Sequence, residues 1–97
     1  MDLVWLTIPY LRGQAYLAAH QGPAAAAEFQ KILDHRGIAQ IDVIVPLSQL
    51  GLGRAYAVSW QPEKARTAYQ DFFATWKDAD PDIPILKQAK AEYAKLQ

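Results

Sequence analysis

Histidine and aspartate are among the residues of this 97-residue chain whose side chains could act as acids, bases or metal ligands. His20 and His35 lie at no metal-ligand spacing, and the adjacent Asp34 and His35 would point about 100° apart on a helix, with no nucleophile tied to them. We predict a turn position for His20 and a polar helix end for His35. The aspartates within residues 78–82 have the spacing that opens a calcium loop, but prolines intrude and no glutamate follows at the required distance. The sequence therefore predicts no catalytic residue, no cofactor and no metal site.

The bulk composition argues against several classes of partner. Ten basic and ten acidic side chains cancel, which removes the electrostatic attraction on which nearly all nucleic-acid binding depends. The chain has no cysteine, so disulfides and thiolate metal sites are excluded. Residues 1–8 are apolar but too short to span a bilayer, and they lack the basic start and cleavage site of a signal peptide. We predict no nucleic-acid partner, no direct membrane insertion and a cytoplasmic location for the segment.

A stretch of about 20 residues occurs twice, at an offset of 40 residues, and it indicates the elements that position any functional side chain. Residues 13–32 and 53–72 both contain Gly-x-x-Tyr followed by Ala-x-x-x-aromatic, which are spacings of one helix face. Between these two motifs, Gln-Gly-Pro in the first copy and Gln-Pro-Glu in the second end one helix and place proline near the start of the next. The period predicts stacked helical hairpins whose helices cross closely at the glycine and the alanine.

The second copy resembles the tetratricopeptide repeat. The resemblance is carried by Leu52, Gly53, Tyr56, Ala65 and Tyr69. The first copy has the same glycine, tyrosine, alanine and aromatic positions but Arg12 in place of the family's leucine, and neither copy has the family's tryptophan or closing proline. The period of 40 residues also exceeds the family's 34, which implies an insertion. Through the runs 10–16, 28–37 and 76–96, the chain as a whole also resembles the tetratricopeptide segments at the C-terminal end of predicted bacterial serine/threonine kinases.

The predicted fold is all-α, with two tetratricopeptide-like hairpins and a C-terminal capping helix in one domain, residues 1–97. We place the first repeat at about 7–36, an insert loop at 37–45, the second repeat at about 46–78 and the capping helix at about 82–96, with Asp82 as its N-cap. Residues 1–8 either remain from a contact with an upstream repeat or fold back onto the first hairpin. The register predicts an aromatic core of Tyr16, Phe29, Tyr56, Tyr69 and Phe72.

The resemblance implies a non-catalytic protein-interaction module, the C-terminal part of a larger bacterial regulator, whose partner is a protein or peptide. Such modules bind on the concave face, lined by the first helix of each hairpin. The residues expected there are Tyr10, Gln14, Leu17, Leu50, Arg54, Ala57 and Val58, with Lys87 at the border. Trp60, in the turn of the second hairpin, either packs against the neighbouring loop or contacts a partner. The alternative function is a structural cap or self-association segment of a longer solenoid, and two hairpins alone favour upstream repeats or a homo-oligomer.

Overall fold

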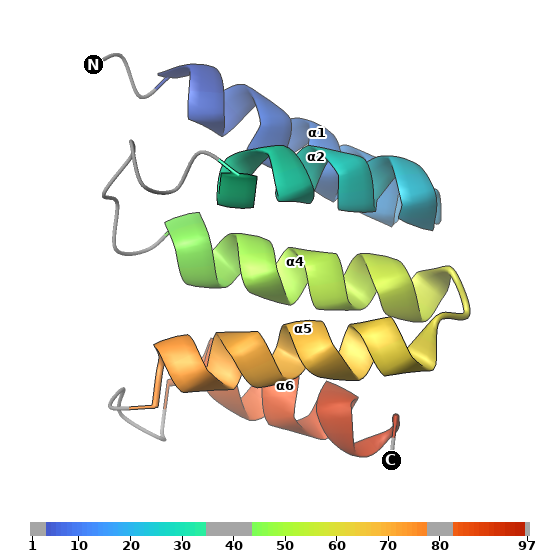
Figure 1. Cartoon of the computed structure of the whole chain (residues 1–97), viewed down its shortest axis with the longest axis vertical. Coiled ribbons are helices and arrows are strands. Elements are labelled where there is room, and N and C mark those ends of the chain that lie inside the picture. The colour runs from blue at the N-terminus through green and yellow to red at the C-terminus, as the bar shows by residue number, and fades with distance from the viewer. Residues whose placement is uncertain (1–3, 35–43, 78–82, 97) are drawn as a thin grey trace.

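The computed structural model describes residues 4–34, 44–77 and 83–96, with side chains described from Ile8 onward in the first helix. Every regular element within these ranges is a helix, which confirms the all-α prediction. The helices are α1 (Val4–Ala18), α2 (Gly22–Asp34), α4 (Ile44–Val58), α5 (Pro62–Thr75) and α6 (Pro84–Ala94). Figure 1 shows them stacked along the long axis, from α1 and α2 at one end to α5 and α6 at the other. His35, most of the expected insert loop and the aspartates within residues 78–82 lie outside the described residues.

The observed starts of three helices differ from the predicted ones, and the N-cap of α6 is not the predicted Asp82. Helix α1 begins at Val4, so Pro9 lies inside it, and α4 begins at Ile44, so Pro46 lies in its first turn. A first-turn nitrogen has no partner within the helix, so Pro46 costs α4 no hydrogen bond. The N-cap of α6 is Ile83, which provides no side-chain cap, and Pro84 occupies the first helical position.

The turns after α1 and α4 have the same backbone geometry. His20 and Trp60 both have φ of 59°, the left-handed conformation. In the first turn the N–H of Gln21 donates to the carbonyl of Tyr16 at 2.8 Å, and the equivalent bond in the second turn is 2.9 Å. This pattern is the Schellman helix ending, in which glycine is the usual left-handed residue. The predicted turn position of His20 is confirmed.

The first hydrophobic cluster joins α2, α4 and α5 and consists of Ala25, Ala26, Phe29, Leu52, Ala55 and Ala68. At its centre the ring of Phe29 lies between two glycines. A Cβ atom built on Gly13 of α1 would lie 2.7 Å from the Cζ atom of Phe29, and one on Gly51 of α4 would lie 2.5 Å from it. Neither helix could keep its distance from α2 with a larger residue there. The close crossing predicted for Gly13 is therefore confirmed, and Gly51, which the repeat pattern does not mark, does the same from the other side.

A second cluster joins α5 and α6 and consists of Tyr69, Phe72, Leu86 and Ala89 with Leu50 of α4. Trp76 packs onto this cluster, with its ring 5.2 Å from that of Phe72. Trp76 therefore covers the contact between α5 and α6.

The predicted aromatic core is correct for three of its five members. Phe29, Tyr69 and Phe72 are buried, and Tyr56 is half-buried against the first cluster. The prediction was wrong for Tyr16, which is 36% exposed. Among the described residues no helix packs against this side of α1, whereas α2 covers the equivalent side of α4.

Candidate functional site

A groove of about 370 Å³ lies between the end of α1, the second half of α4 and the end of α6. It is lined by Leu17, His20, Arg54, Ala57, Val58, Tyr69, Glu92, Lys95 and Leu96. Its volume is in the range of ligand sites, and like them it combines apolar walls with a few polar groups. We refer to it below as the groove.

The groove brings together four of the residues that the sequence predicted for a binding face. Arg54, Ala57 and Val58 share one side of α4 because they are spaced i, i+3 and i+4. Leu17 joins them from the last turn of α1, which packs beside α4. Helical register therefore brings these four residues to one hollow, and their role in binding stays a prediction.

The position of Leu50 differs from the prediction. It was expected on the binding face, but it is 1% exposed and packs with Tyr69, Phe72 and Leu86. It lies one turn before Arg54 on α4, at the level where α6 packs against the chain. Because the repeat register does not say where the last helix docks, the sequence offered no sign that Leu50 would be covered.

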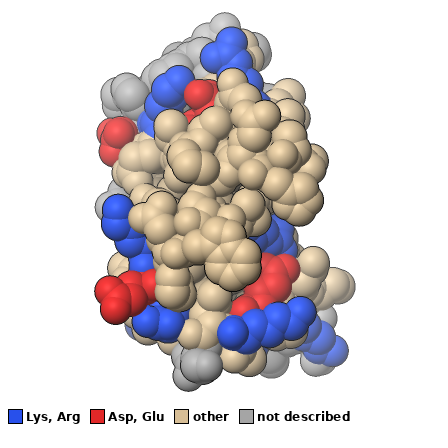
Figure 2. Space-filling model, turned by 90° about the vertical axis from the view of Figure 1, so that its right-hand side faces the viewer, with Lys and Arg blue, Asp and Glu red and all other residues tan. Residues whose placement is uncertain are grey.

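The remaining predicted residues lie outside the groove lining. Tyr10 is half-buried and its ring meets that of Phe29 edge-on at 5.9 Å, so it belongs to the core. Gln14 is half-buried and Lys87 is exposed on α6. Trp60 is 90% exposed, which rules out packing against a neighbouring loop and leaves a partner contact as its predicted role. Figure 2, the view from the right-hand side of Figure 1, shows uncharged side chains over the middle of that face of the molecule and charged ones toward its edges.

A charged network forms one wall of the groove. Arg54 donates from Nε to Oε1 of Glu92 at 2.8 Å and from its terminal nitrogen to Oε2 at 3.0 Å, a bidentate ion pair. The hydroxyl of Tyr69 donates to the same Oε1 at 2.7 Å. Three elements, α4, α5 and α6, thus meet at one carboxylate. Sequence reasoning missed Glu92 because 38 residues separate it from Arg54 and no motif links them.

The network moves the pKa of each member away from neutral pH. Burial by itself would raise the pKa of Glu92, but the hydrogen bonds from Arg54 and Tyr69 outweigh burial and lower it from the ordinary value of 4.5. Burial and the hydrogen bond to Glu92 raise the pKa of Tyr69. Burial would lower the pKa of Arg54, yet its contacts with Glu92 raise it. A general acid or base at neutral pH needs a pKa near 7, so this network is suited to holding helices and orienting polar groups.

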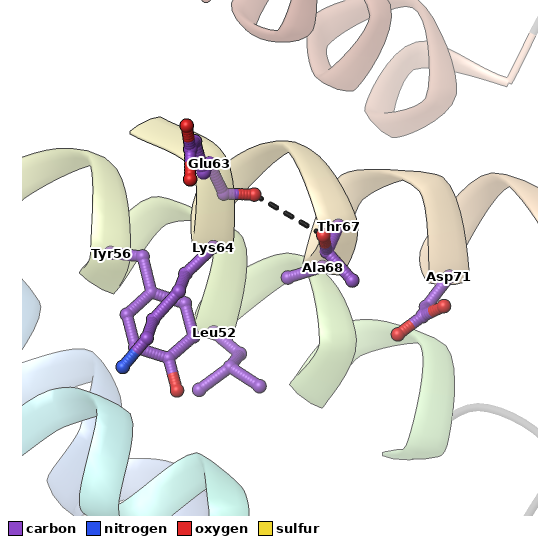
Figure 3. A pocket seen from close by; sticks show the side chains of 7 residues that line it. All are labelled: Leu52, Tyr56, Glu63, Lys64, Thr67, Ala68 and Asp71. Carbon is purple, nitrogen blue, oxygen red and sulfur yellow. Dashed lines mark hydrogen bonds between the residues drawn. The ribbon is translucent and has the colours of Figure 1, made fainter. Parts of the chain in front are cut away.

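A larger hollow, of about 510 Å³, lies along α4 and α5 and is drawn in Figure 3. Its polar side chains do not converge on one point. Lys64 lies over the ring of Tyr56, 5.7 Å from the centroid, and the hydroxyl of Thr67 donates to the carbonyl of Glu63 in its own helix. Glu63 points away from the Lys64–Tyr56 pair in Figure 3. We therefore take the smaller groove, whose polar groups do converge, as the candidate site.

Within the described ranges, no three His, Cys, Asp or Glu side chains come close enough to hold a metal ion. None of the described helices combines the length and apolar character needed to cross a membrane. No protein-family model matches the chain, no curated protein sequence is significantly similar to it, and no solved structure matches it. The resemblance to tetratricopeptide repeats and to bacterial kinase segments stays a prediction.

Proposed function

We propose that this chain is a protein-interaction module of the tetratricopeptide type, and that a peptide segment of another protein binds in the groove. One observation carries the proposal: the groove is lined by four residues selected by helical register, Leu17, Arg54, Ala57 and Val58, and it combines apolar surface with one wall formed by the charged network. Helical pairs with matching turns 40 residues apart support the repeat assignment.

The chemistry of the groove indicates what the peptide supplies. Leu17, Ala57, Val58 and Leu96 offer apolar surface, so the ligand contributes aliphatic or aromatic side chains, which provide most of the binding free energy. Arg54 already donates hydrogen bonds to both carboxylate oxygens of Glu92. A carboxylate of the peptide could therefore pair with Arg54 only by displacing the carboxylate of Glu92. We therefore expect neutral hydrogen-bonding groups of the peptide to contact the wall formed by the charged network.

The test is a selection of peptides from a displayed library, followed by calorimetry on three proteins: the wild type, Ala57→Trp and Ala27→Trp. Ala57 lines the groove, so tryptophan there fills it and should weaken binding at least about tenfold, a loss of roughly 1.4 kcal/mol. Ala27 is an exposed alanine on α2 outside the groove lining, so the same change there should leave the affinity intact.

Circular dichroism must first show that all three proteins are equally helical. Selected peptides that bind Ala57→Trp as tightly as the wild type would place recognition on another surface and overturn the groove assignment. A selection that yields no peptide would favour the alternative function, a cap that terminates a solenoid.

A further inference from the structure

A third hollow, of about 240 Å³, lies between α2, α4 and α5. Its polar lining consists of Gln30 and Asp34 of α2, Gln49 of α4 and Asp71 of α5. We refer to it as the acidic hollow. Helical periodicity places Gln49 on the side of α4 opposite to Arg54, so the acidic hollow and the groove lie on different faces of the molecule.

Two aspartates give the acidic hollow its negative charge. Gln30 donates from Nε2 to Oδ1 of Asp34 at 3.0 Å, which leaves Oδ2 of Asp34 and Oε1 of Gln30 as acceptors. The salt bridges between described residues, Lys31–Glu28 and Arg54–Glu92, involve neither Asp34 nor Asp71. No lysine or arginine of the described ranges lines the acidic hollow, so its two carboxylates are complementary to a positively charged ligand.

A buried amide provides a separate indication of a ligand. Gln49 is only 6% exposed, and its Oε1 accepts no hydrogen bond from the described residues. Buried polar atoms nearly always have a partner, because an unpaired one is costly. Glu28 and Ser48 also have an unpaired buried oxygen, but they line none of the three hollows. At Gln49 the missing donor can come from a group that enters the acidic hollow.

We propose that an arginine side chain of a partner protein binds in the acidic hollow. The guanidinium group has a permanent positive charge and five N–H donors in one plane, and it has no acceptor. The acidic hollow offers the reverse, with acceptors from three helices and no cation. Its volume is below the roughly 300 Å³ at which pockets for whole small molecules begin, so it accommodates the end of one side chain. The aliphatic stem of the arginine would lie against Leu33 and Leu52.

Other cations match this lining less well. Within the described ranges, no three carboxylates or histidines converge as a metal site would require. The ammonium group of a lysine is compact and strongly hydrated and has three donors, so it satisfies fewer of the dispersed acceptors.

The surroundings of the acidic hollow favour a protein as the source of the arginine. The acidic hollow shares Leu52, Ala68 and Asp71 with the larger hollow of Figure 3. In that figure Asp71 lies at the opposite end from the pair of Lys64 and Tyr56. A polypeptide that carries the arginine can therefore continue along α4 and α5. Because the groove takes no part, this inference does not depend on the proposed function.

A titration of ¹⁵N-labelled protein followed by nuclear magnetic resonance tests the proposal. The probe is N-acetylarginine amide, and N-acetylcitrulline amide is a control of nearly the same shape without the charge. We expect the arginine probe to shift the side-chain amide signals of Gln49 and the backbone signals of Asp34 and Asp71 in a saturable manner. The dissociation constant should be on the order of 1 mM, as for other ligands of this size. The citrulline probe should cause no saturable shift.

Three variants separate specific binding from general attraction to acidic side chains. Asp71→Asn should weaken binding about fivefold, whereas Glu63→Gln, at an exposed acid of α5 outside the acidic hollow, should change it little. Gln49→Met keeps the length of the side chain and removes the amide, so it should also weaken binding. A purely structural Gln49 would alter the free energy of unfolding and leave the affinity unchanged.

Several outcomes would overturn the proposal. Equal shifts from the arginine and citrulline probes, or equal affinities of Asp71→Asn and Glu63→Gln, would mean that the acidic hollow has no specific cation site. Tighter binding of calcium chloride than of the arginine probe would identify a metal site instead. The chain's own Arg36 follows Asp34 by two residues, so binding that appears only in Arg36→Ala would show that the cation comes from this chain and not from a partner.

Discussion

Helices α1 and α4 have the same pattern, yet their side chains have different surroundings. Ala55 is fully buried under α2, whereas its counterpart Ala15 is exposed. Arg54 forms an ion pair with Glu92 of α6. Gln14, which corresponds to Arg54 at the 40-residue offset, takes no part in that ion pair. The difference teaches that register predicts which face of a repeat helix is used, while the adjacent element decides how much each residue on it contributes to stability.

The sharpest test of this comparison substitutes the paired alanines. Ala55→Glu would bury an unpaired carboxylate between α4 and α2, and we expect it to lower the free energy of unfolding by about 4 kcal/mol or more. Ala15→Glu places the same group in water, and its effect should stay within about 0.5 kcal/mol. Urea denaturation gives both values.

The same pair could also show that the two helices are equivalent. If Ala15→Glu destabilised the single chain as strongly as Ala55→Glu, a covering element would have to lie on α1, and the distinction between the two faces would fail. The wild type measured at several concentrations is the control for self-association.

A smaller effect is expected from substitution of Arg54 on α4 than of Ala55, and a smaller one still from Arg12 on α1. Arg54→Ala removes both hydrogen bonds that a half-buried Glu92 accepts from the guanidinium and leaves it the hydrogen bond from Tyr69, and loss of a hydrogen bond to a charged group typically costs about 1.5–3 kcal/mol. Arg12 is exposed on α1, and Arg12→Ala should change the free energy of unfolding by less than about 0.5 kcal/mol. Equal losses from both substitutions, measured by urea denaturation, would contradict the role assigned to the network.

The pH dependence of the stability of the wild type and of Arg54→Ala distinguishes the loss of the ion pair with Glu92 from the loss of packing by the arginine side chain. Folding lowers the pKa of Glu92, so its contribution to stability is present above the ordinary value of 4.5 and is lost as the pH falls through the lower value of the folded state. The stability difference between the wild type and Arg54→Ala should therefore shrink over that range. A difference that stays constant with pH would mean that Arg54 acts through its aliphatic stem.

The smallest effect tests a feature that both hairpins share. His20 and Trp60 occupy the left-handed position of the two turns, where a side chain costs about 1 kcal/mol relative to glycine. His20→Gly and Trp60→Gly should each raise the free energy of unfolding by a few tenths to about 1 kcal/mol, and by similar amounts, because the strain is local. A Trp60→Gly protein that is less stable than the wild type would show that the indole packs on the molecule despite its exposure.

Much of the fold follows from short-range sequence patterns. Glycine and tyrosine three residues apart, with proline after a turn, are sufficient to predict the helical pairs and the crossing at Gly13. The environments of Leu50 and Glu92 are set by where α6 docks, and that depends on contacts between residues more than 20 positions apart. Tyr16 fails as a core residue for a related reason: its register is correct, but burial requires a neighbour that sequence spacing cannot provide.

The ring of Phe29 fills the space left by the missing side chains of Gly13 on α1 and Gly51 on α4. Helix α2 packs as extensively against the next pair as against its own partner. In a linear array the balance between coupling inside a unit and coupling between units sets how many units unfold together. With the two nearly equal here, no boundary between the pairs is weak enough to open first. The two hairpins should therefore melt as one cooperative body, and the thermodynamic unit of this protein is larger than the unit that repeats in its sequence.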